Sequence, residues 1–313
     1  MKQNQKEILK KQTVKHYGVS EKFNREWQSF FNKATSVLFV SDLQVGAMTS
    51  ACSSKPLIRD KDTYYTPSVK SKAVNKVLHN GTKRLLKKKT DVLVIVGEGI
   101  DGANPQQQGN QSWTTNQLDQ VNDCVKLLHE LFEWKVCYVS RGSKYHVQNG
   151  AVDYDDILAE KLGANKNSPF GGQNLTDDYG YLNVHGVVIQ YAHHISYAKN
   201  PWSKGSPLAK EALLCELNES TRAHLYVRGH VHSCDGYWGY IGDNDYPTQI
   251  FTNPCAKYPD SFLMKAGMGG TIPNIGFTEV LVFPNGQYYI NPIVAQPKIP
   301  KQIADVHRAL RGK

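Results

Sequence analysis

The chain has 313 residues, of which 40% are hydrophobic, and it carries a formal net charge of +9. This length supports one large core or two smaller ones, and this composition argues against a disordered chain. No apolar run approaches the roughly 18 residues of a membrane-spanning helix, and the polar N-terminus lacks the apolar segment of a signal peptide. We therefore expect a globular protein of the cytoplasm with no membrane partner.

The net charge lies at the two ends of the chain. Residues 1–35 contain eight lysines and arginines against three glutamates, and residues 298–313 contain five against one aspartate. The 262 residues between them balance 24 basic and 24 acidic side chains. This pattern indicates a neutral domain over residues 36–297, between a basic helical N-terminal arm and a basic C-terminal tail. The two ends either bind nucleic acid or another polyanion, or serve only as soluble termini.

Six cysteines are spread along the chain without any CxxC pair. Their spacing fits neither a disulfide framework nor a zinc ribbon. We therefore expect reduced, mostly buried thiols at Cys52, Cys124, Cys137, Cys215, Cys234 and Cys255.

The arm and the domain have different periodicities. Apolar residues of the arm recur at near-helical spacing, and Trp27 and Phe31 are expected to pack on the domain. The domain alternates expected strands (36–40, 91–96 and 135–140) with expected helices (68–89, 116–134 and 153–164). Hairpins over 181–192 and 280–290, a helix over 207–217 and a strand over 223–229 follow. This order predicts an α/β layered sandwich with mixed sheets.

Each of five expected strands is followed by polar residues that can bind a metal. In chain order they are Asp42 and Gln44, Glu98 and Asp101, Ser143 to His146, His193 and His194, and His230 and His232. Ligands of α/β sheets bind at the carboxyl ends of strands, and imidazoles with carboxylates are the ligand set of ions such as Mn, Fe or Zn. The sequence therefore predicts a metal centre, in which a carboxylate can bridge two ions about 3.5–4 Å apart.

The pair His230 and His232 requires a bend in the chain. Two histidines that stand two residues apart on an extended segment reach neighbouring positions only if the backbone turns. Gly229 directly precedes them, and glycine adopts turn conformations at little energetic cost. We expect the turn at Gly229.

The segments "SDLQVG", "GEGIDG", "RGSKYH", "YAHH" and "RGHVH" resemble, in order and spacing, the motifs of calcineurin-like metallophosphoesterases. The longer run from "RGSKYHV" to "YVRGHVH" is more similar to the phage and prophage branch. The resemblance covers about residues 36–290 and implies a four-layer αββα sandwich of two mixed sheets flanked by helices. It also implies one or two divalent ions (Mn, Zn, Fe or Mg), with a metal-bound hydroxide attacking the phosphorus of a phosphomonoester or phosphodiester.

The resemblance also implies roles for the residues at the strand ends. Asp42 and His232 would bind the first ion, His193 and His230 the second, and Glu98 would bridge both. The remaining implied roles are metal ligands at Gln44 and Ser143, a general acid at His146, a catalytic carboxylate at Asp101, and substrate-binding groups at Arg141, Lys144 and His194.

Three ligand positions differ from the family's motifs. Gln44 stands where the family has histidine, Glu98 where it has aspartate, and Ser143 where asparagine is usual, although the phage branch commonly has a small hydroxyl residue there. An amide oxygen suits harder ions, and a carboxylate misplaced by about 1 Å costs roughly a hundredfold in rate. Two functions therefore stay open: a hydrolase with an altered metal site, or an impaired phosphoesterase-fold protein that binds nucleic acid or protein.

Overall fold

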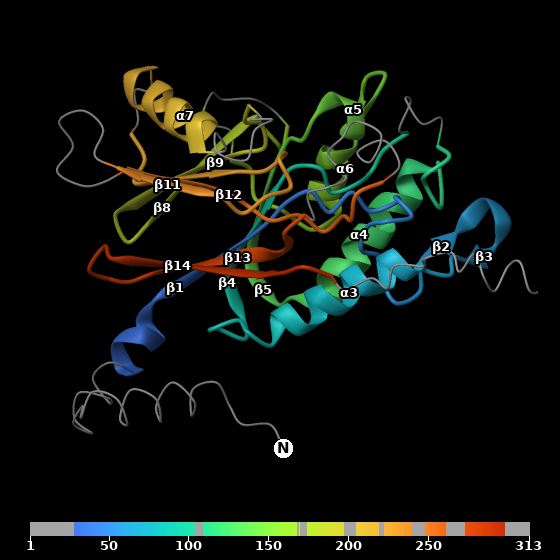
Figure 1. The fold of residues 1–313 in the computed structure, drawn as a ribbon, viewed down its shortest axis with the longest axis horizontal. Helices are drawn as coiled ribbons and strands as arrows, with labels where there is room; N and C mark the ends of the chain where they lie inside the picture. The colour runs from blue at the N-terminus through green and yellow to red at the C-terminus, as the bar shows by residue number, and fades with distance from the viewer. Residues whose placement is uncertain are drawn as a thin grey trace, which may run out of the picture.

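A computed structural model of the chain describes residues 28–103, 109–167, 169, 174–196, 205–218, 222–239, 248–260 and 273–297. Two five-stranded sheets lie face to face. Figure 1 shows α7 on the outer side of one sheet, and α3 and α4 on the outer side of the other. The four-layer αββα sandwich of two mixed sheets, flanked by helices, is therefore confirmed.

The first sheet has the strand order β14-β13-β1-β4-β5. Strands β1, β4 and β5 run parallel to one another. Strand β13 is antiparallel to both of its neighbours, β1 and β14. Val37 and Phe39 of β1 face the second sheet, while Leu38 and Val40 face the helices. Because both faces are covered, the run is apolar throughout. The strands are β1 (Thr35–Val40), β4 (Thr90–Val96), β5 (Trp134–Ser140), β13 (Ile275–Val282) and β14 (Tyr288–Ala295).

The second sheet has the strand order β11-β12-β10-β9-β8, in which β9, β10 and β12 run parallel and β8 and β11 are antiparallel edges. Neither β11 nor β12 is among the strands expected from the sequence. Strand β11 is short and has glycine at both ends, a residue that is depleted in strands. The strands are β8 (Tyr179–Val184), β9 (Val187–Ala192), β10 (Leu225–Arg228), β11 (Gly236–Gly239) and β12 (Thr248–Thr252).

Helices cover the outer faces. Side chains of α3 (Val69–Thr82), α4 (Gln117–Leu131) and α6 (Tyr154–Lys161) form one core with the first sheet. Side chains of α7 (Gly205–Asn218) form another with the second sheet. The smaller elements are α5 (Lys144–Val147), the 3-10 turn η1 (Arg59–Lys61) and the hairpins of β2 (Leu57–Ile58) with β3 (Thr63–Tyr64) and of β6 (Gln148–Asn149) with β7 (Val152–Asp153).

Local capping starts the helices where the sequence predicts them. Ser68 accepts the backbone N–H of Ser71 at the start of α3, a typical N-cap bond. The helix expected over 68–89 nevertheless ends at Thr82. The carboxylate of Glu279 on β13 accepts the backbone N–H groups of Leu86 and Lys87, at 2.9 and 3.0 Å. Because Leu86 and Lys87 donate their N–H groups to Glu279, these groups make no helical hydrogen bonds, and the chain after Thr82 is not helical.

The described part of the N-terminal region packs on the first sheet. The ring of Phe30 stacks on that of Phe283 at 4.7 Å, and Phe31 lies 6.2 Å from the same ring. Trp27, the rest of the arm and the tail 298–313 lie outside the described residues. The division into arm, domain and tail therefore stays a prediction. None of the helices in the described ranges is long and apolar enough to cross a membrane.

The cysteines behave as expected. All six lie in the described part of the chain, none forms a disulfide there, and all except the partly exposed Cys234 are buried.

Candidate metal centre

The loops that follow β1 and β4 continue the pairing of these two strands. The backbone N–H of Asp42 donates to the carbonyl of Gly97 at 3.3 Å, and that of Gln44 donates to Glu98 at 2.9 Å. Asp42, Gln44 and Glu98 have φ values of 50°, 44° and 55°. Such left-handed conformations are uncommon outside glycine and concentrate at functional sites. They bring all three side chains to the carboxyl edge of the first sheet.

The second sheet contributes histidines from the ends of β9 and β10. The N–H of Gly229 donates to the carbonyl of His193 at 3.1 Å, which places the two strand ends side by side. The expectation that the chain turns at Gly229 is wrong. The residues with left-handed backbone are His230 and His232, with φ of 71° and 52°. Gly229 serves close packing instead: a Cβ there would lie 2.9 Å from His193 Nδ1 and 3.1 Å from Asp42 Oδ2.

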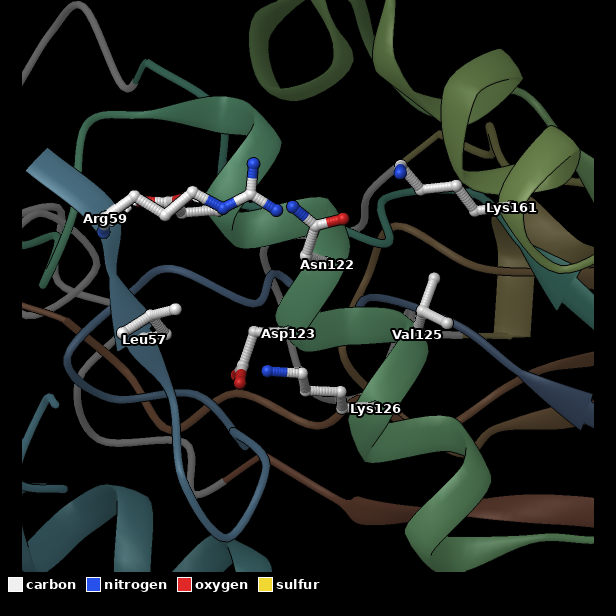
Figure 2. A pocket seen from close by; sticks show the side chains of 8 residues that line it. Leu57, Arg59, Asn122, Asp123, Val125, Lys126 and Lys161 are labelled. Carbon is white, nitrogen blue, oxygen red and sulfur yellow. Dashed lines mark hydrogen bonds and ion pairs between the residues drawn. The ribbon is translucent and has the colours of Figure 1, made fainter. Parts of the chain in front are cut away.

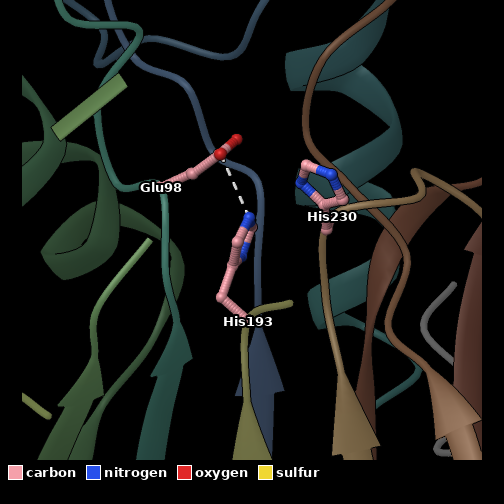
Figure 3. Close-up of side chains that lie close together, drawn as sticks. All are labelled: Glu98, His193 and His230. Atoms are coloured by element: carbon pink, nitrogen blue, oxygen red, sulfur yellow. Dashed lines mark ion pairs between the residues drawn. The ribbon is translucent and has the colours of Figure 1, made fainter. Parts of the chain in front are cut away.

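Two groups of ligand atoms form at this edge. Glu98, His193 and His230 make one group, and Asp42, Glu98 and His232 make the other. In each group, one ligand atom per residue lies within 4.8 Å of the others. Figure 3 shows the first group, with His193 and His230 rising from neighbouring strands and Glu98 from the opposite sheet. Glu98 belongs to both groups, as a bridging ligand would.

The donor set fits divalent cations. His193 Nδ1 lies 2.9 Å from the carbonyl oxygen of Val96, and since a carbonyl only accepts, Nδ1 carries the proton and Nε2 can bind an ion. His193 Nε2 and Asp42 Oδ1 are buried without hydrogen bonds. They lie 3.0 Å from Glu98 Oε1 and 3.2 Å from His232 Nε2, respectively. Buried polar atoms that face one another without hydrogen bonds suit a cation between them.

The charges around Glu98 also suit a divalent cation. Burial raises the pKa of Glu98, but His146 and His193 hold it well below its usual value. Burial lowers the pKa of His193, yet Glu98 and Asp42 raise it to about 9. Burial and His193 lower the pKa of His230. Before an ion binds, a proton on His193 therefore balances Glu98, and an ion can replace that proton.

His232 interacts with Cys255, a contact that was not expected from the sequence. Burial lowers its pKa, but Cys255 and Asp42 raise it well above the usual value. The thiol of Cys255 also lies 3.3 Å from the carbonyl oxygen of Lys257. A lone cysteine in the sequence carries no signal for such a role, since most buried cysteines only fill space.

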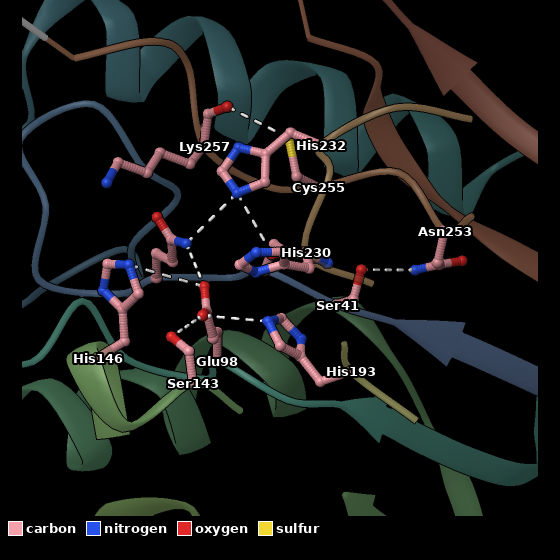
Figure 4. A network of polar contacts seen from close by, with 12 residues as sticks. Ser41, Glu98, Ser143, His146, His193, His230, His232, Asn253, Cys255 and Lys257 are labelled. Carbon is pink, nitrogen blue, oxygen red and sulfur yellow. Dashed lines mark hydrogen bonds and ion pairs between the residues drawn. The ribbon is translucent and has the colours of Figure 1, made fainter. Parts of the chain in front are cut away.

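Gln44 and Ser143 hold Glu98 from two sides. Gln44 Nε2 donates to Glu98 Oε2 and lies 3.3 Å from His232 Nε2. Ser143 Oγ donates to Glu98 Oε1. Figure 4 shows the side chains of Ser143, His146 and His193 around the Glu98 carboxylate. The oxygen Gln44 Oε1 is buried without a hydrogen bond, so the amide presents its nitrogen, and not the expected ligand oxygen, to the centre.

His146 and Asp101 lie beside the two ligand groups. His146 Nδ1 donates to the backbone carbonyl of Asp101 at 2.8 Å, and its Nε2 lies 3.8 Å from Glu98 Oε2. The Asp101 carboxylate accepts from Lys257 Nζ at 3.0 Å and from Ser112 Oγ at 3.1 Å. Asp101 belongs to neither ligand group, and its role as a catalytic carboxylate stays a prediction. Lys257 was missed, because nothing in "CAKYPD" distinguishes a buried lysine from an exposed one.

The three predicted substrate-binding residues have different surroundings. His194 is exposed, and its ring lies 5.2 Å from that of His193 and 5.4 Å from that of His230. Arg141 Nε is 2.6 Å from a carboxylate oxygen of Asp153, so its guanidinium is already paired. Lys144 is exposed at the start of α5. The structure therefore brings only His194 against the candidate ligands, and all three roles stay predictions.

Figure 2 shows a separate cavity of about 350 Å³ along α4, which no candidate ligand lines. Its two buried carboxylates are already engaged. Asp119 lies 3.3 Å from Arg59 Nε, and Asp123 accepts the backbone N–H of Ser53 at 3.1 Å. Among the described residues, the groups that could hold a metal ion lie at the strand ends.

No family model matches the sequence, and no curated protein is similar to it at the sequence level. Solved structures show a weak likeness. Vacuolar protein sorting 29 from Cryptosporidium parvum is 12% identical with a TM-score of 0.37, over 82% of this chain and 96% of that one. A metallophosphoesterase from Sphaerobacter thermophilus is 12% identical with a TM-score of 0.35, over 85% and 89%. The sulfate thiohydrolase of Thermus thermophilus is 11% identical with a TM-score of 0.38, over 83% and 57%. At these scores the likeness supports no statement about function.

Proposed function

We propose that this chain is a metal-dependent phosphoesterase of the calcineurin-like kind, which hydrolyses a phosphomonoester or a phosphodiester. One observation carries the proposal: Glu98 belongs both to the group of His193 and His230 and to the group of Asp42 and His232. A carboxylate shared between two ligand groups is the arrangement of two-metal phosphoryl chemistry. The order of the five strand-end motifs supports the same assignment.

The ligand groups have separate tasks in this proposal. Glu98, His193 and His230 hold one divalent ion, and Asp42, Glu98 and His232 form the second position. Divalent ions, when bound, neutralise the charge of a phosphoester and lower the pKa of a water ligand. Mn, Zn, Fe and Mg are all candidates, and the histidine-rich first group favours the transition metals among them.

His146 is the proposed general acid. Its Nδ1 is bound to the carbonyl of Asp101, which fixes the ring so that Nε2 faces Glu98 at 3.8 Å. In its protonated form, Nε2–H gives its proton to the leaving oxygen of the ester. His194 is exposed beside His193 and His230, where it can contact a phosphate oxygen.

One observation favours a second function, that of an impaired phosphoesterase fold that binds nucleic acid or protein. Gln44 presents an N–H group to Glu98, where a hydrolase with two ions needs a ligand atom. The basic ends of the chain would supply the binding surface in that case, by contacts to phosphate groups.

Turnover of a bis-aryl phosphodiester and of an aryl phosphomonoester distinguishes the two functions. We expect turnover with at least one of the four ions, its loss in His230→Ala, and its retention in His79→Ala, which changes an exposed histidine of α3. No turnover with any bound ion would contradict the hydrolase. Salt-dependent nucleic-acid binding that survives a chelator would then support the binding function.

A further inference from the structure

The side chain of Gln44 lies where the two ligand groups meet. Its Nε2 donates to Glu98 Oε2 and lies 3.3 Å from His232 Nε2. Glu98 and His232 are two of the three members of the group that also contains Asp42. An ion in that group needs the lone pair of Glu98 Oε2 to which the amide donates, and a His232 Nε2 without its proton. The amide in this position and an ion in this group therefore exclude each other.

The amide cannot simply turn over to offer its oxygen. A carboxylate accepts hydrogen bonds and does not donate them, and Glu98 Oε2 accepts from Gln44 while Oε1 accepts from Ser143. Without an ion in this group, a turned amide would place Gln44 Oε1 against Glu98 Oε2, two oxygens that repel each other. The orientation with nitrogen inward is retained even though it leaves Oε1 buried without a hydrogen bond.

Gln44 also has no room to swing away. Only 2% of the residue is exposed, and its backbone N–H is bonded to the carbonyl of Glu98 at 2.9 Å. Its φ of 44° is a left-handed conformation that the paired loops impose. The side chain is therefore held against Glu98 from both ends.

The amide contacts the other ligand group through Glu98 Oε2. In the described part of the chain, the hydrogen bonds of the Gln44 side chain go to Glu98 and His232. His193 Nε2 makes no hydrogen bond and faces Glu98 Oε1 at 3.0 Å. The group of Glu98, His193 and His230 thus keeps, in His193 Nε2, a ligand atom that the amide does not contact.

We infer that the Gln44 amide takes the place of one metal ion and that the protein binds a single divalent ion through Glu98, His193 and His230. This inference rests on the proposed metal centre and narrows it: the amide fills the position of Asp42, Glu98 and His232, so that any hydrolysis would use one ion. The –NH₂ group does electrostatically, with two N–H dipoles, part of what a second cation would do: it faces both Glu98 and His232 and keeps them together.

Metal content per chain tests the inference. The full-length protein is equilibrated with Mn²⁺ or with Zn²⁺, desalted and analysed by elemental mass spectrometry, and calorimetric titration gives an independent stoichiometry. We expect one ion in the wild type. Gln44→Glu has the same length but replaces the N–H donor by an anionic oxygen, and we expect it to bind two ions. Gln148→Glu makes the same change in β6, at a residue that belongs to neither ligand group, and we expect it to bind one.

The outcomes separate this inference from the proposed function. Zero or two ions in the wild type would overturn it, and so would a single ion in a folded Gln44→Glu. If Gln44→Glu does not fold, Gln44→His supplies a neutral ligand in the same position and is expected to hold two ions. A wild type with one ion and no turnover would leave the inference standing and remove the hydrolase, and an active wild type with two ions would do the reverse.

Discussion

Asp155 accepts a hydrogen bond from the backbone N–H of Glu98 over 3.3 Å, although 57 residues separate the two. The same carboxylate accepts the N–H groups of Gly99 at 3.3 Å and of Gly142 at 2.8 Å. Asp155 lies in the first turn of α6 and is fully buried. The start of this helix therefore fixes the loops after β4 and β5, which carry Glu98 and Ser143.

Asp155→Asn is expected to lower the free energy of unfolding by about 1–3 kcal/mol, the usual cost of buried groups that lose their hydrogen-bond partner. An asparagine keeps one acceptor oxygen, and its –NH₂ group would face a backbone N–H. Unfolding in urea measures the difference. The matched change Asp60→Asn, at an exposed position of η1, should stay within about 0.5 kcal/mol of the wild type. Equal values for the two variants would show that Asp155 does not hold the loops.

Metal affinity is expected to rise with pH because of His193. Burial lowers its pKa, but Glu98 and Asp42 raise it to about 9, so an ion must displace a proton from Nε2. The affinity for Mn²⁺ should therefore increase about tenfold per pH unit between about pH 7 and 9. The stability of the metal-free fold changes with pH in the opposite direction. The raised pKa of His193 contributes its full stabilisation below about pH 6.5, and this contribution is lost as the pH rises through about 9.

Calorimetric titration with Mn²⁺ at several pH values measures this dependence. Buffers of different ionisation enthalpy should report close to one proton released per ion. An affinity that does not change with pH would mean that His193 binds no proton before the ion.

His146→Asn is designed to remove only the acid. The asparagine amide can still donate to the carbonyl of Asp101, as His146 Nδ1 does at 2.8 Å, but it lacks Nε2. We expect the turnover of an alkyl phosphoester to fall by about 10²–10⁴-fold. A p-nitrophenyl ester should lose much less, because its leaving group needs no proton. Metal content should not change. Equal losses for both esters would contradict the acid role.

Lys257→Met is expected to lower the free energy of unfolding by about 3–5 kcal/mol, because it leaves buried carboxylates without their cation. Lys257 Nζ lies 3.0 Å from Asp101 and 3.1 Å from Asp260. Burial lowers the pKa of Lys257, but both carboxylates raise it above its usual value, so the charge persists at neutral pH.

The control for this variant is Lys135→Met. Lys135 pairs with Asp91 at 2.6 Å, but its side chain is 62% exposed. Exposed pairs contribute about 0–1 kcal/mol. Similar losses in the two variants, measured by urea unfolding, would mean that the Lys257 pairs contribute no more than a surface contact.

The sequence by itself determined the layers and the edge at which the chemistry gathers. A strand covered on both faces must be apolar throughout, as Val37 to Val40 are, and a helix on one face must repeat its apolar residues every three or four positions. Polar residues directly after such strands, among them Glu98 and His230, therefore mark the carboxyl edge of the sheets. These inferences need only local periodicity, which burial imposes on neighbouring residues.

Only the tertiary structure decided what each polar side chain does at that edge. Gln44 meets Glu98 across 54 residues and His232 across 188, and no periodicity of the chain records which atom of the amide faces them. Lys257 comes from a loop that the sequence leaves without a motif, yet it neutralises Asp101. Such contacts depend on how two separate sheets pack, because the direction of each hydrogen bond is set by the partners that packing brings within reach.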